Sequence, residues 1–466
     1  MWIDRVIKKY ISLDTPYWLQ ELAGNLFLYR RELRNSINIR YLRFSRFLKT
    51  SQWFSCRELL RYQLERLQEL LHYAYKNVPY YTEIFMKNNL SLDDFNSIRD
   101  LRKFPILTKG EIVKNFDKLI ATPVSKKYMQ LIRTSGSTGT PLEFYRDRRD
   151  EYIHSAFNKR LLDSFNLAIY DRNVLISQIP FIDRHSEDKY IYDQGLKLLS
   201  LSPFPQDTGL WSTYITLIKH FKPVYITGSP SSLYYLGYHI KENNMCGVKF
   251  RVFISSFENL FTYQREFIER QFGCKVYNYY LSREHVMSGF ECLNQDGLHL
   301  DMERGITEVV DDEGRVLSNG LSGRIIAKGF YNFAMPFIRY DTKDIGALSD
   351  VACPCGRGLL LLKYLEGRTS EVIKYNNKCI TASALAGIIR QFSNIKECQF
   401  IQEKDDRLLL NIIKTNNFLE SDTKEIVNQL HNKLGAGLDI KINFVEDIPR
   451  TKMGKFPFVV SKLTMR

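Results

Sequence analysis

Thr134-Ser135-Gly136-Ser137-Thr138-Gly139-Thr140-Pro141 is the stretch that restricts the fold of this chain most, because hydroxyl side chains and two glycines crowd into eight consecutive positions. Gly136 and Gly139 allow a positive φ, so backbone N–H groups and hydroxyls can converge on the oxygens of a phosphate. An apolar run at 129–132 leads in and a helical pattern follows, which favours an anion-binding loop over a flexible Ser/Gly linker. No Gly-Lys-Ser/Thr follows at the required offset, so the loop is not a Walker A motif.

Length and composition indicate a globular protein with more than one core. The chain has 466 residues, of which 44% are hydrophobic and 25% charged, enough for one large and one smaller domain. It contains no run of 18 apolar residues, and its N-terminus lacks the residue order of a secretory signal. We therefore expect a cytoplasmic protein, in which the eight cysteines do not form a disulfide framework.

The net charge of +14 is spread along the chain and is densest in the first 62 residues. No recognition motif accompanies this charge, so we do not expect a nucleic-acid partner. Basic residues interleaved with aromatic ones suit a surface near anionic lipid headgroups on the cytoplasmic face of a membrane, or equally an ordinary docking arm. The basic residues of this extension include Arg30, Arg31, Arg34, Arg40, Arg43, Arg46 and Lys49.

The apolar pattern predicts an α/β fold with a second, smaller unit. Residues up to about 125 are predicted to be mainly helical. Short apolar strands then alternate with helices, one of which should begin at Ser229-Pro230, and this alternation predicts parallel or mixed sheets. The predicted strands of this part are 174–177, 224–227, 252–255 and 276–279, and a β-rich stretch (324–330, then 337–340) begins near Gly323.

A compact α+β unit of about 100 residues is predicted after Gly367. Its expected helices are 382–391 and 422–434, and its expected strands include 398–402, 408–414 and 441–445. We divide the chain into a basic, aromatic N-terminal extension (1–62), a core domain (63–366) and a mobile C-terminal domain (367–466).

Four further clusters follow the glycine-rich loop in order. In Tyr280-Leu281-Ser282-Arg283-Glu284, a carboxylate after a strand and turn is suited to hold Mg²⁺ beside phosphates. In Arg339-Tyr340-Asp341-Thr342-Lys343-Asp344, an acid at a strand end is suited to accept from two ribose hydroxyls. The third cluster is Gly367-Arg368, and the fourth is the cationic loop Pro449-Arg450-Thr451-Lys452-Met453-Gly454-Lys455.

Together these clusters resemble the adenylate-forming superfamily, in its branch of phenylacetate-CoA ligases, coenzyme F390 synthetases and CapK-type proteins. The resemblance covers the chain from about Leu59 to the end. It is most specific in the loop at 134–141, in the run 334–344 and in the Gly454-Lys455 ending. It implies a large adenylate-forming domain with a small β-rich subdomain and a C-terminal lid domain. The implied reaction has two halves, in which a carboxylate and ATP form an acyl-adenylate and pyrophosphate, and a nucleophile then displaces AMP.

The resemblance also implies roles for single residues. Glu284 would hold Mg²⁺, Arg368 would mark the hinge of the small domain, and Lys455 would bridge the carboxylate and the α-phosphate. A cation brought in by a mobile domain would stabilise the charge that develops on phosphorus. ATP would be bound by the loop residues Thr134, Ser135, Gly136, Ser137, Thr138 and Gly139, by Tyr280, and by Asp344 at the ribose.

Three positions depart from the family pattern. Leu281 stands where glycine is usual, Arg283 replaces a Thr or Ser, and Phe257 takes the place of a glycine that lines the adenine and acyl pocket. Arg283 could supply a cationic contact or point away from the site. These departures admit the alternative of a non-catalytic relative that serves as a scaffold.

Four residues suggest a metal site. Cys292 and His299 follow the first acidic cluster, and Cys353 and Cys355 follow the second. Three thiolates and one imidazole suit a closed tetrahedral, structural Zn²⁺. The spacing is not that of a common zinc finger, and Cys-X-Cys turns also occur without metal, so the sequence leaves both interpretations open.

The acid and its acceptor are not fixed by the sequence. The family's founding chemistry is ligation of a small carboxylic acid to CoA. CapK-type members are associated with capsule or exopolysaccharide synthesis, where an acyl group could be passed to an amino sugar as an amide. The resemblance therefore implies an ATP-dependent acid ligase that passes the acyl group to an acceptor in capsule, exopolysaccharide or O-antigen synthesis, with an acid-CoA ligase and an inactive scaffold as alternatives.

Overall fold

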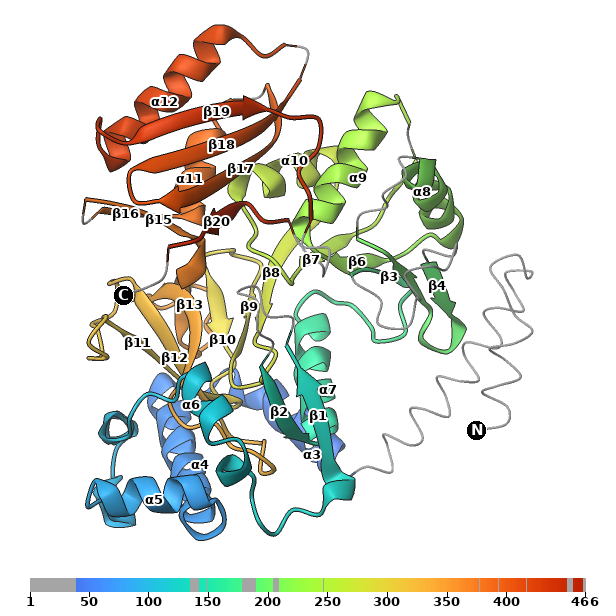
Figure 1. Cartoon of the computed structure of the whole chain (residues 1–466). Helices are drawn as coiled ribbons and strands as arrows, with labels where there is room; N and C mark the ends of the chain where they lie inside the picture. The colour runs from blue at the N-terminus through green and yellow to red at the C-terminus, as the bar shows by residue number, and fades with distance from the viewer. Residues whose placement is uncertain are drawn as a thin grey trace.

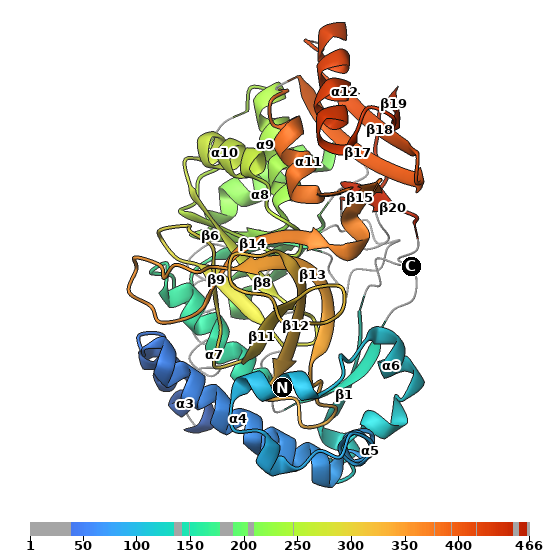
Figure 2. The same ribbon diagram turned by 90° about the vertical axis from the view of Figure 1, so that its left-hand side faces the viewer.

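The structure of the chain is a computed structural model that describes residues 39–134, 142–148, 150–177, 190–203, 209–245, 247–376, 378–392, 394–415, 417–450 and 456–463. Both views show three parts in a row, with helices at one end, a large sheet in the middle and a small α+β unit at the other end (Figure 1, Figure 2). Most of the glycine-rich loop and Lys455 lie outside the described residues.

A 12-stranded sheet forms the middle of the molecule. Its strands in chain order are β3 (Asn173–Ile176), β4 (Tyr190–Asp193), β5 (Leu198–Leu201), β6 (Tyr225–Gly228), β7 (Val252–Ser255), β8 (Lys275–Leu281), β9 (Ser288–Glu291), β10 (Leu298–Leu300), β11 (Gly305–Val310), β12 (Gly323–Gly329), β13 (Tyr340–Leu348) and β14 (Leu361–Arg368). In space their order is β11-β12-β13-β14-β10-β9-β8-β7-β6-β3-β5-β4. The neighbouring strands β8, β7, β6, β3 and β5 run parallel to one another. All other neighbouring pairs of this sheet are antiparallel. The predicted mixed α/β core is confirmed.

Three helices cover the parallel half of the sheet: α8 (Gly209–Phe221), α9 (Pro230–Glu242) and α10 (Thr262–Phe272). Helix α9 begins after Ser229 as predicted, but the Ser229 hydroxyl bonds the Ser232 hydroxyl at 2.5 Å and makes no side-chain cap. The predicted strand at 337–340 is wrong, because β13 begins only at Tyr340.

Helices α3 (Ile39–Ser51), α4 (Cys56–Asn77) and α5 (Pro79–Lys87) lie at one end of the molecule (Figure 2). Ser55 and Glu58 form a capping box that starts α4. One face of α4 is buried against the antiparallel half of the sheet, where Leu67 and Leu71 share a core with Leu298 and Leu362. None of the helices in the described part of the chain is both long and apolar enough to span a bilayer.

The C-terminal unit has its own sheet and core. It comprises β15 (Val372–Tyr375), β16 (Lys378–Thr381), α11 (Ala382–Ile389), β17 (Ile395–Lys404), β18 (Arg407–Lys414), α12 (Glu420–Leu434), β19 (Asp439–Phe444) and β20 (Val459–Ser461). Four of its strands form a sheet in the order β19-β18-β17-β20. Buried side chains of α11 and α12 pack on this sheet, among them Leu385, Phe400 and Leu430. The predicted helices and strands of this unit are confirmed within a few residues.

The proposed domain limits fall inside continuous elements. Residue 62 lies within α4, and residue 367 lies within β14, which passes from the large sheet toward the C-terminal unit. Gly367 has a φ of 111°, a conformation that only glycine adopts easily, so β14 changes direction there.

Candidate active site

Glu284 lies in the turn that follows β8, where the parallel half of the sheet meets the antiparallel half. Its carboxylate accepts a hydrogen bond of 3.0 Å from the hydroxyl of Tyr340, the first residue of β13. Burial raises the pKa of Glu284 above its usual value, although the Tyr340 bond and Arg368 act in the opposite direction. A bound cation would favour the ionised form, so a divalent metal with oxygen ligands fits this position.

Asp344 and Arg368 lie directly opposite each other on β13 and β14. The carboxylate of Asp344 accepts a hydrogen bond of 2.6 Å from the Tyr280 hydroxyl, and Arg368 Nε lies 3.5 Å from its other oxygen. The Asp344 charge raises the pKa of Arg368. Asp344 was predicted at a strand end, whereas it lies within β13, because that strand continues to Leu348. The structure thus joins three separate sequence clusters at one place.

Thr134 closes the base of the glycine-rich loop. Strands β1 (Met129–Arg133) and β2 (Glu143–Asp147) form an antiparallel hairpin around it. Thr134 N–H donates to the Leu142 carbonyl at 2.9 Å, and Leu142 N–H donates to the Thr134 hydroxyl at 3.0 Å. The predicted helix does follow, but only after β2, as α7 (Asp150–Asp163). Ser135, Gly136, Ser137, Thr138 and Gly139 lie outside the described residues.

Two cations near Glu284 were not predicted. Lys109 is the first residue of α6 (Lys109–Lys114), and its segment is fixed beside β13 because Leu107 N–H donates to the Arg339 carbonyl at 2.9 Å. Burial and the charge of Arg368 lower the pKa of Lys109. The Arg146 guanidinium of β2 donates to the Arg283 carbonyl, and burial lowers its pKa to about 10. Neither residue lies in a recognisable motif, and each reaches the site only through tertiary folding.

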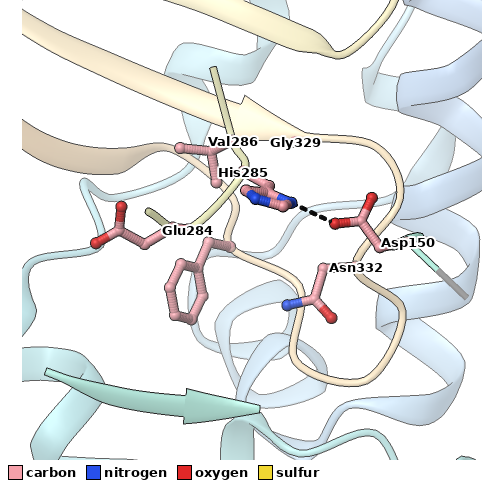
Figure 3. Close-up of a pocket in the computed structure, with 7 residues that line it drawn as sticks. Asp150, Glu284, His285, Val286, Gly329 and Asn332 are labelled. Carbon is pink, nitrogen blue, oxygen red and sulfur yellow. Dashed lines mark hydrogen bonds and ion pairs between the residues drawn. The ribbon is translucent and has the colours of Figure 1, made fainter. Parts of the chain in front are cut away.

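A small pocket at this turn is lined by Asp150, Glu284, His285 and Asn332 (Figure 3). His285 donates from Nδ1 to Asp150 at 2.6 Å, while the Glu284 side chain points away from that pair (Figure 3). Burial lowers the pKa of His285 to about 4, so the imidazole is neutral at physiological pH. Its ring stacks on His154 with centroids 4.5 Å apart. These contacts fix the backbone that presents Glu284.

The departures from the family pattern have distinct local structures. Phe257 has a φ of 72° and its side chain is 50% exposed in the loop after β7, so it keeps a backbone conformation that favours glycine. The side chain of Arg283 is exposed to solvent. Its carbonyl, rather than its guanidinium, accepts the contact from Arg146.

The four predicted metal ligands form a cluster apart from this site. Cys292 Sγ and Cys353 Sγ are 3.6 Å apart, and Cys355 Sγ and His299 Nε2 are 3.4 Å apart. All four ligand atoms lie within 4.8 Å of one another. A tetrahedral Zn²⁺ with Zn–S bonds of about 2.3 Å requires sulfur atoms roughly 3.8 Å apart, so the donor set fits zinc.

Comparison with solved structures shows which proteins share this fold. The 2-hydroxyisobutyryl-CoA ligase in its postadenylation state matches with a TM-score of 0.73 and 18% identity, over 88% of this chain and 90% of that one. In its thioesterification state the same ligase matches with a TM-score of only 0.58. The chain has the fold of the adenylate-forming CoA ligases, as the sequence predicted.

Sequence comparisons place the chain more narrowly. The CapK C-terminal domain matches residues 372–462. Protein CapK of Staphylococcus aureus is 26% identical over 422 residues, which are 88% of this chain and 90% of that protein. A phenylacetate-coenzyme A ligase of Aromatoleum evansii is 26% identical over 325 residues, 68% of this chain and 72% of that enzyme. The chain is thus homologous to CapK and to phenylacetate-CoA ligases, in agreement with the predicted resemblance.

Proposed function

We propose that the protein is an ATP-dependent, AMP-forming acid ligase. The observation that carries this proposal is the convergence of Glu284, Asp344 and Arg368, with each acid held by a tyrosine hydroxyl, beside the cation Lys109. The arrangement offers one carboxylate for a metal, a second for ribose hydroxyls, and cations for phosphate charge.

In the first half-reaction, a substrate carboxylate oxygen attacks the α-phosphorus of ATP, and pyrophosphate leaves. Glu284 would hold Mg²⁺, which neutralises phosphate charge when bound. Asp344 would accept from the ribose hydroxyls, and the Tyr280 ring would lie against the nucleotide. The loop from Thr134 to Gly139 would hold the β- and γ-phosphates, and Lys455 would bridge the acid and the α-phosphate. Arg368, paired with Asp344, would mark the hinge of the C-terminal domain at 367.

In the second half-reaction, an acceptor attacks the acyl carbonyl and AMP leaves. The likeness to Protein CapK supports an acceptor in capsule, exopolysaccharide or O-antigen synthesis, such as an amino sugar that becomes an amide. The likeness to phenylacetate-CoA ligase supports the alternative that CoA is the acceptor. A scaffold without activity is the third candidate, motivated by Leu281, Arg283 and Phe257.

ATP–pyrophosphate exchange tests the first half-reaction. A panel of aromatic, amino and short-chain acids should contain at least one acid that supports exchange, and addition of CoA or an amino sugar then separates the two acceptors. Lys455→Ala should lower exchange by about 10²- to 10³-fold while ATP binding persists. If no acid in the panel supports exchange, the scaffold is favoured. Full exchange by the Lys455→Ala variant would refute the role of that lysine.

We also propose peripheral association with anionic membranes through the N-terminal extension. In α3 the apolar face, with Tyr41 and Leu48, is buried against Phe157 of α7, so this helix offers charge rather than an inserting surface. Its outward residues are Arg40, Arg43, Arg46 and Lys49. Binding to vesicles that contain phosphatidylserine should weaken as salt rises. Equal binding to neutral vesicles, or none to either kind, would contradict the proposal.

Finally, we propose that Cys292, His299, Cys353 and Cys355 hold a structural Zn²⁺. The ligand separations and the burial of His299 support a closed site without an open coordination position. Metal analysis of the purified protein should give close to one equivalent of zinc, and Cys292→Ser should lose it. Less than a tenth of an equivalent in the unaltered protein would refute the site.

A further inference from the structure

We infer that Tyr235 and Glu258 of the large domain are positioning residues for the first half-reaction. They hold the C-terminal unit on both sides of residues 451–455, the segment that ends in Lys455. This inference rests on the proposed function. It means that two residues not predicted as site residues favour the first half-reaction over the second.

The first contact is made by Arg450, immediately before the segment. Its guanidinium donates to Glu397 of β17 at 2.7 Å and lies 4.8 Å from the centre of the Tyr235 ring in α9. The Arg450 and Glu397 side chains are only 16% and 6% exposed. The ring of Tyr235 in the large domain therefore packs against a buried ion pair of the C-terminal unit.

The second contact is made by Phe456, immediately after the segment. Its backbone N–H donates to Glu258 Oε1 at 3.0 Å, in the loop that follows β7. The other oxygen of Glu258 accepts from Ser231 in the first turn of α9. Two residues further on, the Phe458 ring packs on Phe261 with centroids 4.8 Å apart. Glu258 thus links the start of α9 to the chain that leads into β20.

The Glu258 contact lies at the carboxyl end of the parallel strand β7, the edge at which ligands of α/β sheets bind, and Tyr235 lies in the helix that follows the neighbouring strand β6. Arg450 contacts α9 and Phe456 contacts the loop after β7, and the dark red chain after β19 runs down beside α9 (Figure 1). The arrangement matches the postadenylation state of the 2-hydroxyisobutyryl-CoA ligase better than its thioesterification state, with TM-scores of 0.73 and 0.58. The two contacts therefore belong to the arrangement that serves acyl-adenylate formation.

Other contacts between the two units are of a different kind. Arg390, the residue after α11, pairs with Glu266 of α10, and both side chains are more than 40% exposed, at 48% and 42%. Exposed pairs contribute little to stability. Arg390→Ala therefore serves as a matched control, because it removes an ionic contact between the same units without altering the ends of the segment.

The test compares Tyr235→Leu, which removes the ring beside Arg450, Glu258→Gln and Arg390→Ala with the unaltered protein. Hydrogen exchange at the Phe456 amide needs no substrate, and it should accelerate at least about tenfold in the first two variants and remain unchanged in the control. ATP–pyrophosphate exchange with an acid found in the panel should fall by about tenfold in the same two variants. Transfer of the acyl group from the chemically prepared acyl-adenylate to its acceptor should stay within about twofold, and a merely structural defect would lower it too.

Two results would overturn the inference. One is unchanged amide exchange in both variants, and the other is an equal loss in both half-reactions. If no acid supports exchange in the unaltered protein, the proposed function fails, and the amide exchange still decides whether Tyr235 and Glu258 hold the segment.

Discussion

Tyr340→Phe is expected to shift the pH dependence of acyl-adenylate formation. The substitution removes the hydroxyl that donates to Glu284 at 3.0 Å and leaves the ring in its place. Burial already raises the pKa of Glu284, and the Tyr340 bond is one of the contacts that favour its ionised form. A hydrogen bond to a charged group contributes about 1.5–3 kcal/mol, which corresponds to roughly one to two pH units.

The direction of the shift in the pH profile depends on which form of Glu284 binds a metal. Only the ionised carboxylate holds Mg²⁺, so activity is present above the raised pKa of Glu284 and is lost as the pH falls through it. Loss of the Tyr340 hydroxyl raises that pKa further. The acidic limb of the pH profile should therefore move to higher pH by roughly one to two units, and more Mg²⁺ should restore part of the activity.

The assay is ATP–pyrophosphate exchange measured across a pH series at fixed Mg²⁺. Tyr280→Phe is the matched control, because its hydroxyl donates to Asp344 and not to Glu284. The control should weaken ATP binding and leave the acidic limb where it is. An acidic limb that stays in place in Tyr340→Phe, or moves equally in both variants, would refute the reasoning.

Three further predictions concern stability. Arg160 is 3% exposed and pairs with Asp301 and Glu303, so Arg160→Met leaves two buried carboxylates without their cation. Urea unfolding should show that the free energy of unfolding falls by about 3–5 kcal/mol. The control Lys159→Met removes an exposed pair and should lower the free energy of unfolding by less than about 1 kcal/mol. Gly228→Ala should lower the melting temperature, because the added Cβ would lie 2.8 Å from a carbonyl oxygen of the neighbouring strand; an unchanged value would mean that the strands can separate. A chelator that removes the proposed zinc should also lower the melting temperature, whereas equal melting with and without it would show that the metal does not support the fold.

Much of the fold could be predicted from local sequence patterns, because these helices and strands are determined by residues close together in the chain. The parallel strands at 174, 252 and 276 are short runs of buried apolar side chains, and the Ser-Pro start of α9 lies in adjacent positions. The strand β2 was missed because Glu143–Asp147 is short and mostly polar, and it is recognisable only by its pairing with β1. Propensity alone does not find such a hairpin.

The candidate site shows the same division. Glu284, Asp344 and Arg368 were predicted from motifs. They lie together because neighbouring parts of the sheet carry them. The partners Tyr340 and Lys109 were not predicted as site residues. Tyr340 reaches Glu284 from β13, and Lys109 is placed near it by the pairing of Leu107 with Tyr340. No periodicity records a contact between segments so far apart in the chain.

The packing of α4 on the antiparallel half of the sheet has a consequence for synthesis on the ribosome. Leu67 and Leu71 emerge early, but their partners Leu298 and Leu362 lie more than two hundred residues later. Helix α5 and residues 92–104 can pack on α4 soon after it is made, but the part of its apolar face that meets the sheet stays exposed until most of the chain is translated. We expect the nascent N-terminal helices to depend on chaperones, and early truncated products to aggregate.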